Sequence, residues 1–171
     1  MFVFYSGLCP IVEPEVLMEG DFHIDAAYTA TERVLSAVFA ELIRHKVVLE
    51  GIILKPNMVR SGSEFGAQAS PKEIAMRTVS LMQSTVPCAV PGIAFLSGGM
   101  HEEEATEALF CINAMTLSPK PWRLTFSFGR ALQQSCLRGW SGQDDNRESA
   151  QMILVHKAKL NSHASMGIAE C

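Results

Sequence analysis

Short apolar runs alternate with longer segments of helical periodicity along this chain. Four of the runs have strand length, at 9–13, 47–55, 92–96 and 123–128. The segment 24–45 carries apolar side chains at the spacing of one helix face, and helical patterns also follow the second and third runs, span 131–140 and run from after 145 to about 162. Alternating strands and helices predict parallel β/α units. Because the runs are almost continuously apolar, we expect a sheet that is covered on both faces.

Two helix starts have strong local signals. Ser70 is suited to cap a helix, Pro71 to occupy its first position and Glu73 to complete a capping box, so a helix is predicted to begin at Pro71. The other signal is the acidic run Glu102–Glu104, which complements the positive end of a helix dipole.

Composition narrows the class of protein. The chain has 171 residues, of which 48% are hydrophobic and only 19% charged, which favours one folded domain over 1–171 and argues against disorder. The net charge is −4 and no basic stripe is present, so a nucleic-acid partner is not expected. No apolar run reaches ~18 residues, which predicts no membrane span.

Cysteines and histidines give no sign of a metal site. The five cysteines form no C-x-x-C pair, and none of the five histidines joins them at metal-ligand spacing, so no metal and no cofactor are predicted. We expect reduced, buried thiols in an intracellular protein. The apolar start Met1–Tyr5 is too short for a secretory signal, which also favours the cytoplasm.

Candidate chemistry gathers at the C-terminal ends of the predicted strands, where β/α proteins bind ligands. Lys55 ends the second strand, at the edge of an apolar interior that disfavours its ammonium form. A neutral amine there attacks carbonyl groups and forms a Schiff base. The alternative is a lysine that extends its charged end past the strand into water.

Two carboxylates lie at the end of the first predicted strand. Glu13 and Glu15 are two residues apart on an extended segment, so they face the same side and their repulsion favours a general acid or base. The alternative is a pair of solvated glutamates in a loop.

Two further strand ends are suited to phosphate. Ser97, Gly98 and Gly99 precede a helix and offer backbone N–H groups to an anion, although two glycines there also make an ordinary tight turn. Gly129 and Arg130 follow the fourth strand, and the planar guanidinium matches phosphate oxygens.

Several of these segments together resemble one family. They are 11–15 (IVEPE), 49–59 (LEGIILKPNMV), 95–99 (FLSGG), 120–122 (KPW) and 126–133 (FSFGRALQ). In wording, order and spacing, from about residue 10 to about residue 165, they resemble class I fructose-bisphosphate aldolase. The wording around Phe126–Arg130 is most similar to that of plant and algal members.

The resemblance implies a (β/α)8 TIM barrel that cleaves fructose 1,6-bisphosphate reversibly to dihydroxyacetone phosphate and glyceraldehyde 3-phosphate in glycolysis and gluconeogenesis, without metal. It implies that Lys55 is the Schiff-base lysine, Glu13 the acid/base and Glu15 an auxiliary carboxylate. The residues that match the family's phosphate positions are Ser97, Gly98, Gly99, Ser127, Gly129 and Arg130. Sugar bisphosphates and triose phosphates are then the expected substrates, and a homo-oligomer is the expected assembly.

The chain also departs from the family pattern. A barrel of this kind takes ~250 residues, and the match corresponds to strands five to eight with a C-terminal helix, so the chain is predicted to form about four β/α units of a partial aldolase domain. Self-association through the uncovered strands is expected. The alternatives are a catalytically impaired protein that binds metabolites or proteins, and a partial gene product without a role of its own; a plastid location is the alternative to the cytoplasm.

Overall fold

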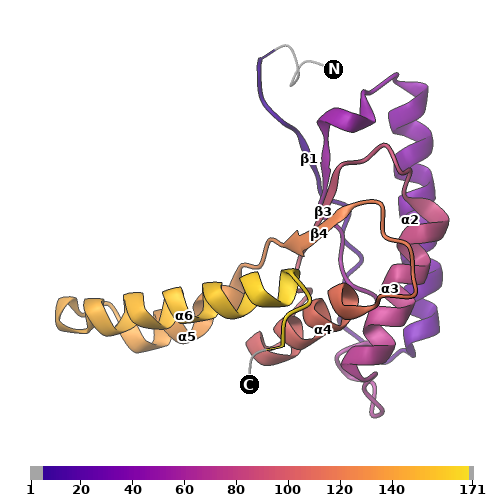
Figure 1. Ribbon diagram of the computed structural model, residues 1–171. Coiled ribbons are helices and arrows are strands. Elements are labelled where there is room, and N and C mark those ends of the chain that lie inside the picture. Colours follow the sequence, from indigo (N-terminus) through magenta and orange to yellow (C-terminus); the bar gives the residue numbers. More distant parts are fainter. Residues whose placement is uncertain (1–5, 170–171) are drawn as a thin grey trace.

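The computed structural model of the chain describes residues 6–169, so the run Met1–Tyr5 and Cys171 lie outside the described part. Four β/α units follow one another, as predicted (Figure 1). The strands are β1 (Ile11–Val12), β2 (Ile53–Leu54), β3 (Gly92–Phe95) and β4 (Arg123–Phe126). The α-helices are α2 (Ile24–Arg44), α3 (Pro71–Thr85), α4 (Glu102–Ala114), α5 (Arg130–Trp140) and α6 (Arg147–Ser165). Single 3-10 turns, η1 and η2, lie at Leu49–Gly51 and Asp144–Asn146.

The four strands form one parallel sheet in the order β1-β2-β3-β4. Each strand therefore pairs with its neighbour in sequence, which is the strand order of a (β/α)8 barrel and not of a doubly wound sheet. The prediction of parallel β/α units is confirmed.

The second strand is much shorter than predicted. Residues 49–51 form the turn η1, in which the Gly51 N–H donates to the Val48 carbonyl at 3.1 Å, and only Ile53 and Leu54 join the sheet. The turn itself sets this limit, because β3 has four residues and still pairs with only Ile53 and Leu54 of β2. The prediction of a strand over 47–55 is wrong for its first half.

The predicted helix starts are confirmed. The Ser70 side chain accepts a hydrogen bond from the Glu73 N–H at 3.3 Å, and Pro71 is the first residue of α3. Helix α4 begins at Glu102 with three carboxylates in its first turn. These starts depend on neighbouring residues alone, which is why the sequence predicts them well.

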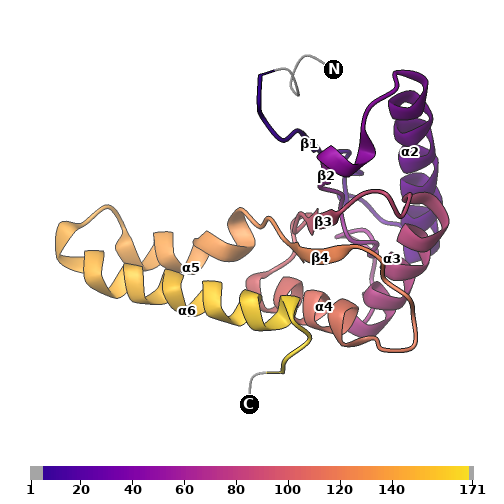
Figure 2. The same cartoon turned by 45° about the horizontal axis from the view of Figure 1, so that its top comes forward.

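In the part of the chain that the structure describes, the sheet is covered on one face only. Leu54, Ile93 and Phe95 are completely buried, whereas residues of opposite parity, such as Ile11 and Thr125, are exposed. Figures 1 and 2 show α2 and α3 side by side on one side of the strands, with α4 next to α3. The expectation of a sheet covered on both faces is therefore wrong. The open face is the one that would point into the centre of a closed barrel.

Helices α5 and α6 pack against each other along their length and extend away from the sheet (Figures 1 and 2). Neither these nor the other helices within residues 6–169 are long and apolar enough to cross a membrane. Cys9 and Cys88 are exposed, and Cys111 and Cys136 are only half-buried, so the expectation of buried thiols is wrong for the described cysteines.

Candidate active site

The C-terminal ends of all four strands lie along the same edge of the sheet, because the strands are parallel. Glu13 follows β1 and Lys55 follows β2. Ser97 and Ser127 come shortly after β3 and β4. The predicted site residues therefore belong to one edge, as expected for this kind of fold.

Lys55 and Glu13 form the closest contact among the predicted site residues. The Lys55 Nζ lies 2.9 Å from Glu13 Oε1, and the side chains are 21% and 47% exposed. The Lys55 N–H donates to the Val12 carbonyl at 2.7 Å, so the lysine continues the ladder between β1 and β2 and its backbone is fixed. A carboxylate in contact with an amine can accept a proton from it, which is the relation that an amine nucleophile and its acid/base partner need.

The register explains why these two side chains meet. Val12 pairs with Leu54, so the next residues along the strands, Glu13 and Lys55, lie side by side. Both share the parity of Ile11 and Ile53 and thus belong to the open face of the sheet. Within residues 6–169 this face of the pair is therefore uncovered.

Glu15 is separate from this pair. It is exposed and forms no ion pair with Lys55 within the described residues. Its segment is held instead by Asn57, whose Oδ1 accepts the Val16 N–H at 3.0 Å and whose Nδ2 donates to Thr31 Oγ1 at 3.2 Å. Asn57 is 1% exposed and ties the loop after β1 to α2. The motif around Lys55 contains this asparagine, but nothing in the sequence indicated its role.

The turn after β3 has the conformation that its glycines permit. Gly98 and Gly99 have φ angles of +54° and +79°, which is the left-handed region that other residues adopt at a cost. Ser97 is 9% exposed, and its carbonyl accepts the Met100 N–H at 3.1 Å. Backbone N–H groups in a turn next to the start of a helix can converge on an anion, so the conformation is compatible with the predicted phosphate role.

The segment after β4 begins at the same edge of the sheet, but its cation, Arg130, lies along α5. The Ser127 N–H donates to the Phe95 carbonyl at 2.8 Å, which keeps Ser127 next to the end of β3. Gly129 is the N-cap of α5 and has no side chain to satisfy the first N–H groups of the helix. Arg130 is exposed and lines a cavity of about 330 Å³ with other side chains of α5. No hydrogen bond or ion pair joins Arg130 to Ser97 within the part of the chain described.

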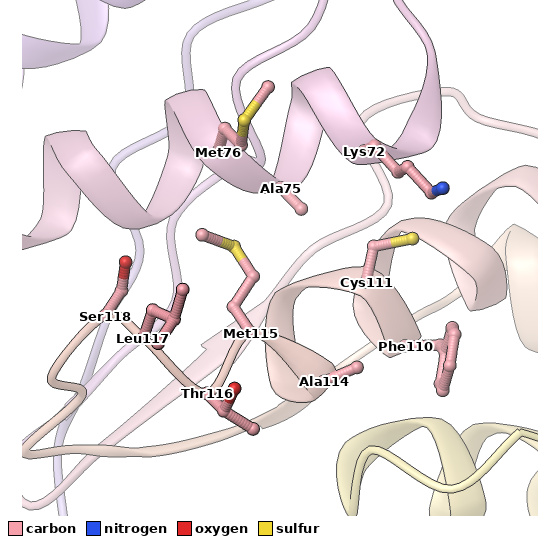
Figure 3. Close-up of a pocket in the computed structure, with 10 residues that line it drawn as sticks. All are labelled: Lys72, Ala75, Met76, Phe110, Cys111, Ala114, Met115, Thr116, Leu117 and Ser118. Atoms are coloured by element: carbon pink, nitrogen blue, oxygen red, sulfur yellow. The ribbon is translucent and has the colours of Figure 1, made fainter.

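A larger groove lies away from this edge. It has a volume of about 440 Å³ and is formed by α3, α4 and the loop after α4 (Figure 3). None of the predicted site residues lines it. Within residues 6–169 no group of three or more His, Cys, Asp or Glu side chains is arranged to hold a metal ion.

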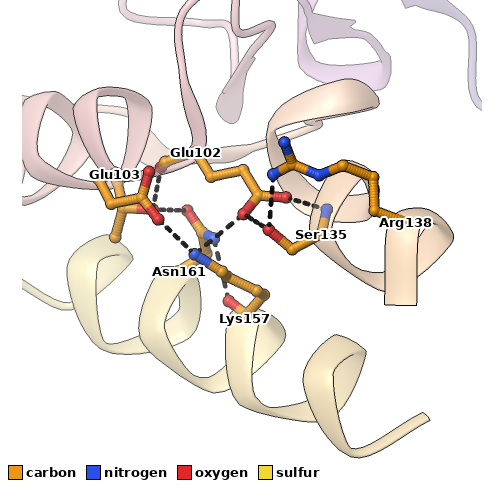
Figure 4. A network of polar contacts seen from close by, with 7 residues as sticks. Glu102, Glu103, Ser135, Arg138, Lys157 and Asn161 are labelled. Atoms are coloured by element: carbon orange, nitrogen blue, oxygen red, sulfur yellow. Dashed lines mark hydrogen bonds and ion pairs between the residues drawn. The ribbon is translucent and has the colours of Figure 1, made fainter. Parts of the chain in front are cut away.

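A buried polar network connects the two proposed phosphate elements (Figure 4). Glu102, in the first turn of α4, accepts the Ser135 N–H of α5 at 2.7 Å and a further hydrogen bond from the Ser135 hydroxyl. Lys157 of α6 lies 3.0 Å from Glu102 and 2.8 Å from Glu103. The network fixes the start of α4 relative to α5 and α6. Apart from the acidic run Glu102–Glu104, nothing in the sequence indicated this network.

Burial by itself raises the pKa of Glu102, but the two hydrogen bonds from Ser135 and the Lys157 ammonium outweigh it and hold the pKa below its ordinary value. Burial likewise lowers the pKa of Lys157, but its contacts with Glu103 and Glu102 outweigh that effect and raise the pKa. Both groups are therefore stabilised in their charged forms.

Four consecutive parallel strands, with a lysine–carboxylate pair at their C-terminal edge, define a segment of a (β/α)8 barrel with its site in the position usual for that fold. The particular barrel follows from comparison with known proteins. The family model for glycolytic class-I fructose-bisphosphate aldolase matches residues 3–170, and the chain belongs to this family.

Individual relatives agree with this assignment. The chain is 51% identical over 162 residues to cytosolic fructose-bisphosphate aldolase 4 of Arabidopsis thaliana and to fructose-bisphosphate aldolase B of Sparus aurata. These alignments cover 95% of this chain but 41% and 44% of the relatives. The plant and fish proteins are equally similar, so identity does not single out the plant members.

A solved structure confirms the fold. The aldolase of Plasmodium falciparum, crystallised with TRAP and a small-molecule inhibitor, is 46% identical and superposes with a TM-score of 0.91 over 96% of this chain and 47% of its own. The 171 residues thus have the fold of one part of an aldolase barrel, and the chain spans less than half the length of these relatives.

Proposed function

We propose that this chain carries the Schiff-base machinery of a fructose-bisphosphate aldolase, and that residues 1–171 are a partial aldolase domain. The contact of 2.9 Å between Lys55 and Glu13 is the observation that supports this most directly. Membership of the aldolase family supports it as well.

In the proposed reaction Lys55 is the nucleophile. Its neutral amine adds to the C2 carbonyl of fructose 1,6-bisphosphate, and the resulting carbinolamine loses water to give a protonated imine. The Glu13 carboxylate takes the proton of the C4 hydroxyl as the C3–C4 bond breaks, and it later returns that proton to C3. The bonding electrons move into the imine to form an enamine. Glyceraldehyde 3-phosphate leaves as the aldehyde. Protonation at C3 and hydrolysis of the imine release dihydroxyacetone phosphate and restore the amine.

Glu13 is the proposed acid/base. Its carboxylate can take a proton from the Lys55 ammonium and return it to the carbinolamine hydroxyl as that hydroxyl leaves as water. Glu15, two residues further along, is proposed as an auxiliary carboxylate that influences Glu13 by charge alone.

The proposed phosphate site is formed by Ser97, the Gly98 and Gly99 N–H groups, Ser127, and Gly129 with Arg130. The left-handed turn and the start of α4 support its first part. In this proposal one phosphate group of the substrate is held at this site while the C2 carbonyl lies next to Lys55.

Competing lysines are less suited to the role. Lys120 donates to the carbonyl oxygens of Ile112 and Asn113 at 2.9 and 3.0 Å, at the end of α4, and so has a structural task. Lys72 lies on α3 at the groove in Figure 3, away from Glu13.

Trapping with borohydride tests the assignment. Reduction of the chain in the presence of dihydroxyacetone phosphate should leave a covalent adduct on Lys55, located by peptide mass spectrometry. The adduct should disappear in Lys55→Met and persist in Lys159→Met, a matched change on the surface of α6. An adduct on Lys72 or Lys120 in place of Lys55 would contradict the proposal.

One observation favours a second candidate function. The open sheet face leaves the substrate side of Lys55 uncovered, and the 171 residues lack the rest of the barrel that the relatives have. A chain of this kind can retain phosphate or imine binding without turnover and act as a metabolite- or protein-binding module. Imine trapping without aldol cleavage is the result that separates this role from catalysis.

The proposed setting is the cytoplasm, with the plastid as the alternative. Two of the Arabidopsis thaliana relatives are named cytosolic, both at 51% identity, and another is named chloroplastic, at 48% identity. Sugar bisphosphates and triose phosphates are the proposed ligands, and self-association is the proposed assembly.

A further inference from the structure

The groove between α3 and α4 has the size of a ligand site. Its volume of about 440 Å³ falls within the range of ~300–1,000 Å³ that small-molecule pockets have. Helices α3 and α4 belong to the outer layer that covers the buried face of the sheet, whereas Lys55 belongs to the open face. The groove is therefore separate from the candidate active site.

The lining is mostly apolar and leaves large side chains in water. Met76 is 55% exposed and Leu117 98% exposed. Met115 lies between them, and Phe110 borders the other end (Figure 3). Methionine side chains adapt their shape to what they contact, which suits a surface for a flexible apolar ligand.

One cation lies at the end of the groove that is opposite Leu117. Lys72 is the charged residue of the lining, and Figure 3 shows its ammonium at the end where Cys111 and Phe110 also lie. Within residues 6–169 Lys72 has no ion-pair partner. Glu107, one turn before Cys111 on α4, does not line the groove.

The place of Lys72 in its helix is also unfavourable for a cation. It is the second residue of α3, where the positive end of the helix dipole repels positive charge. An anion bound at this position would be attracted by Lys72 and by the dipole together. A cation at this position does not stabilise the helix, but it would attract an anion to this end of the groove.

We propose that this groove binds a small linear amphiphile with one carboxylate, such as a medium-chain fatty acid. The carboxylate lies at Lys72, and the apolar tail follows Met76, Met115 and Leu117. Charge complementarity at one end and apolar surface along the rest select this class of ligand over a sugar phosphate, which needs polar groups throughout.

Dodecanoate, kept below its micelle concentration, is the probe. Isothermal titration of the 171-residue chain should show saturable binding of one dodecanoate per chain. Ala114→Trp fills the groove from an exposed position and should abolish this binding. Met76→Glu places a carboxylate beside the apolar tail and should also weaken the binding, which keeps the test decisive if one variant fails to fold.

The contribution of Lys72 is measured separately. Lys72→Gln should weaken dodecanoate about fivefold, as expected for a solvent-exposed ion pair, and should leave the binding of the uncharged dodecanol unchanged. Lys159→Gln, which removes a lysine from α6, should have no effect on either ligand.

Three results would overturn the proposal. They are the absence of saturable dodecanoate binding, unchanged binding in Ala114→Trp, and equal losses in Lys72→Gln and Lys159→Gln. If dodecanoate fails to bind and Ala114→Trp lowers the solution mass, the groove is an interface between copies of this chain and the proposal is wrong.

Discussion

Removal of the Lys157 ammonium is expected to destabilise the fold far more than removal of the Glu103 carboxylate, the exposed one of its two partners. Lys157 contacts Glu102 and Glu103 at similar distances, 3.0 and 2.8 Å, but Glu102 is 4% exposed and Glu103 80% exposed. The two ion pairs share one lysine and differ in burial, so the chain contains its own control.

The expected magnitude follows from that burial. Lys157→Met leaves the buried Glu102 carboxylate with only the Ser135 donors, and breaking a buried pair in this way costs ~3–5 kcal/mol of the free energy of unfolding. Glu103→Gln removes an exposed partner and should cost below ~1 kcal/mol. At ~2–4 °C of midpoint temperature per kcal/mol for a chain of this size, Lys157→Met should lower the midpoint by at least ~6 °C.

The pH dependence identifies the cause. The folded state lowers the pKa of Glu102 from its ordinary 4.5, so the stability it contributes is present above that pH and is lost as the pH falls through the lowered value. The folded state raises the pKa of Lys157 above 10.5, so its contribution is lost as the pH rises through the raised value. The difference between wild type and Lys157→Met should therefore be largest between pH ~5 and ~10 and should shrink in acid.

Urea denaturation followed by circular dichroism, repeated across this pH range, measures these differences. A cost of Lys157→Met no greater than that of Glu103→Gln at pH 7, or a cost that stays constant down to pH 3, would contradict this expectation. Either result would mean that the Glu102 carboxylate is better solvated than its 4% exposure indicates.

Three further outcomes are expected. Arg130→Ala should weaken the binding of dihydroxyacetone phosphate about tenfold, because a charge-assisted contact supplies ~1.5–3 kcal/mol. The binding of unphosphorylated dihydroxyacetone should be unaffected. Equal losses for both ligands in calorimetry would show that Arg130 has a structural role. Gly99→Ala should destabilise the chain by ~1–2 kcal/mol in urea denaturation because φ is +79°, whereas Gly66→Ala, at a position with open space, should be nearly neutral; similar costs would show that the turn is not strained. The 171-residue polypeptide by itself should cleave fructose 1,6-bisphosphate orders of magnitude more slowly than a full-length aldolase, because much of the ~7–11 kcal/mol available from substrate orientation is missing. It should self-associate in sedimentation velocity, because one face of the sheet is open. A monomer with ordinary turnover would contradict both expectations.

Local signals in the sequence predicted the order of elements and most helix starts. The Ser70–Pro71–Glu73 pattern placed the start of α3, because capping involves only residues that are neighbours in the chain. The apolar pattern of 47–55 predicted one strand, but only Ile53 and Leu54 join the sheet. The turn at Leu49–Gly51 takes the preceding residues out of the sheet, so neither β1 nor the longer β3 pairs with them.

The candidate site was predicted in part. Placing Glu13 and Lys55 at the same edge required only that the strands be parallel and that both residues end a strand. The contact of 2.9 Å between them depends on the register of β1 and β2, which the sequence does not specify. The role of Asn57, which joins the loop after β1 to α2, could not be predicted because its partners are 26 and 41 residues away.

The sequence by itself determined the class of fold, the family and the residues that carry the proposed chemistry, because motifs and periodicities are properties of neighbouring positions. Tertiary structure decided which charges meet and which surfaces stay open. Glu102 and Lys157 are 55 residues apart, and their pairing exists only because α4 and α6 pack together. The open face at Lys55 and the groove beside Lys72 likewise result from how the layers assemble, since burial depends on every element that covers a surface and not on the residues that form it.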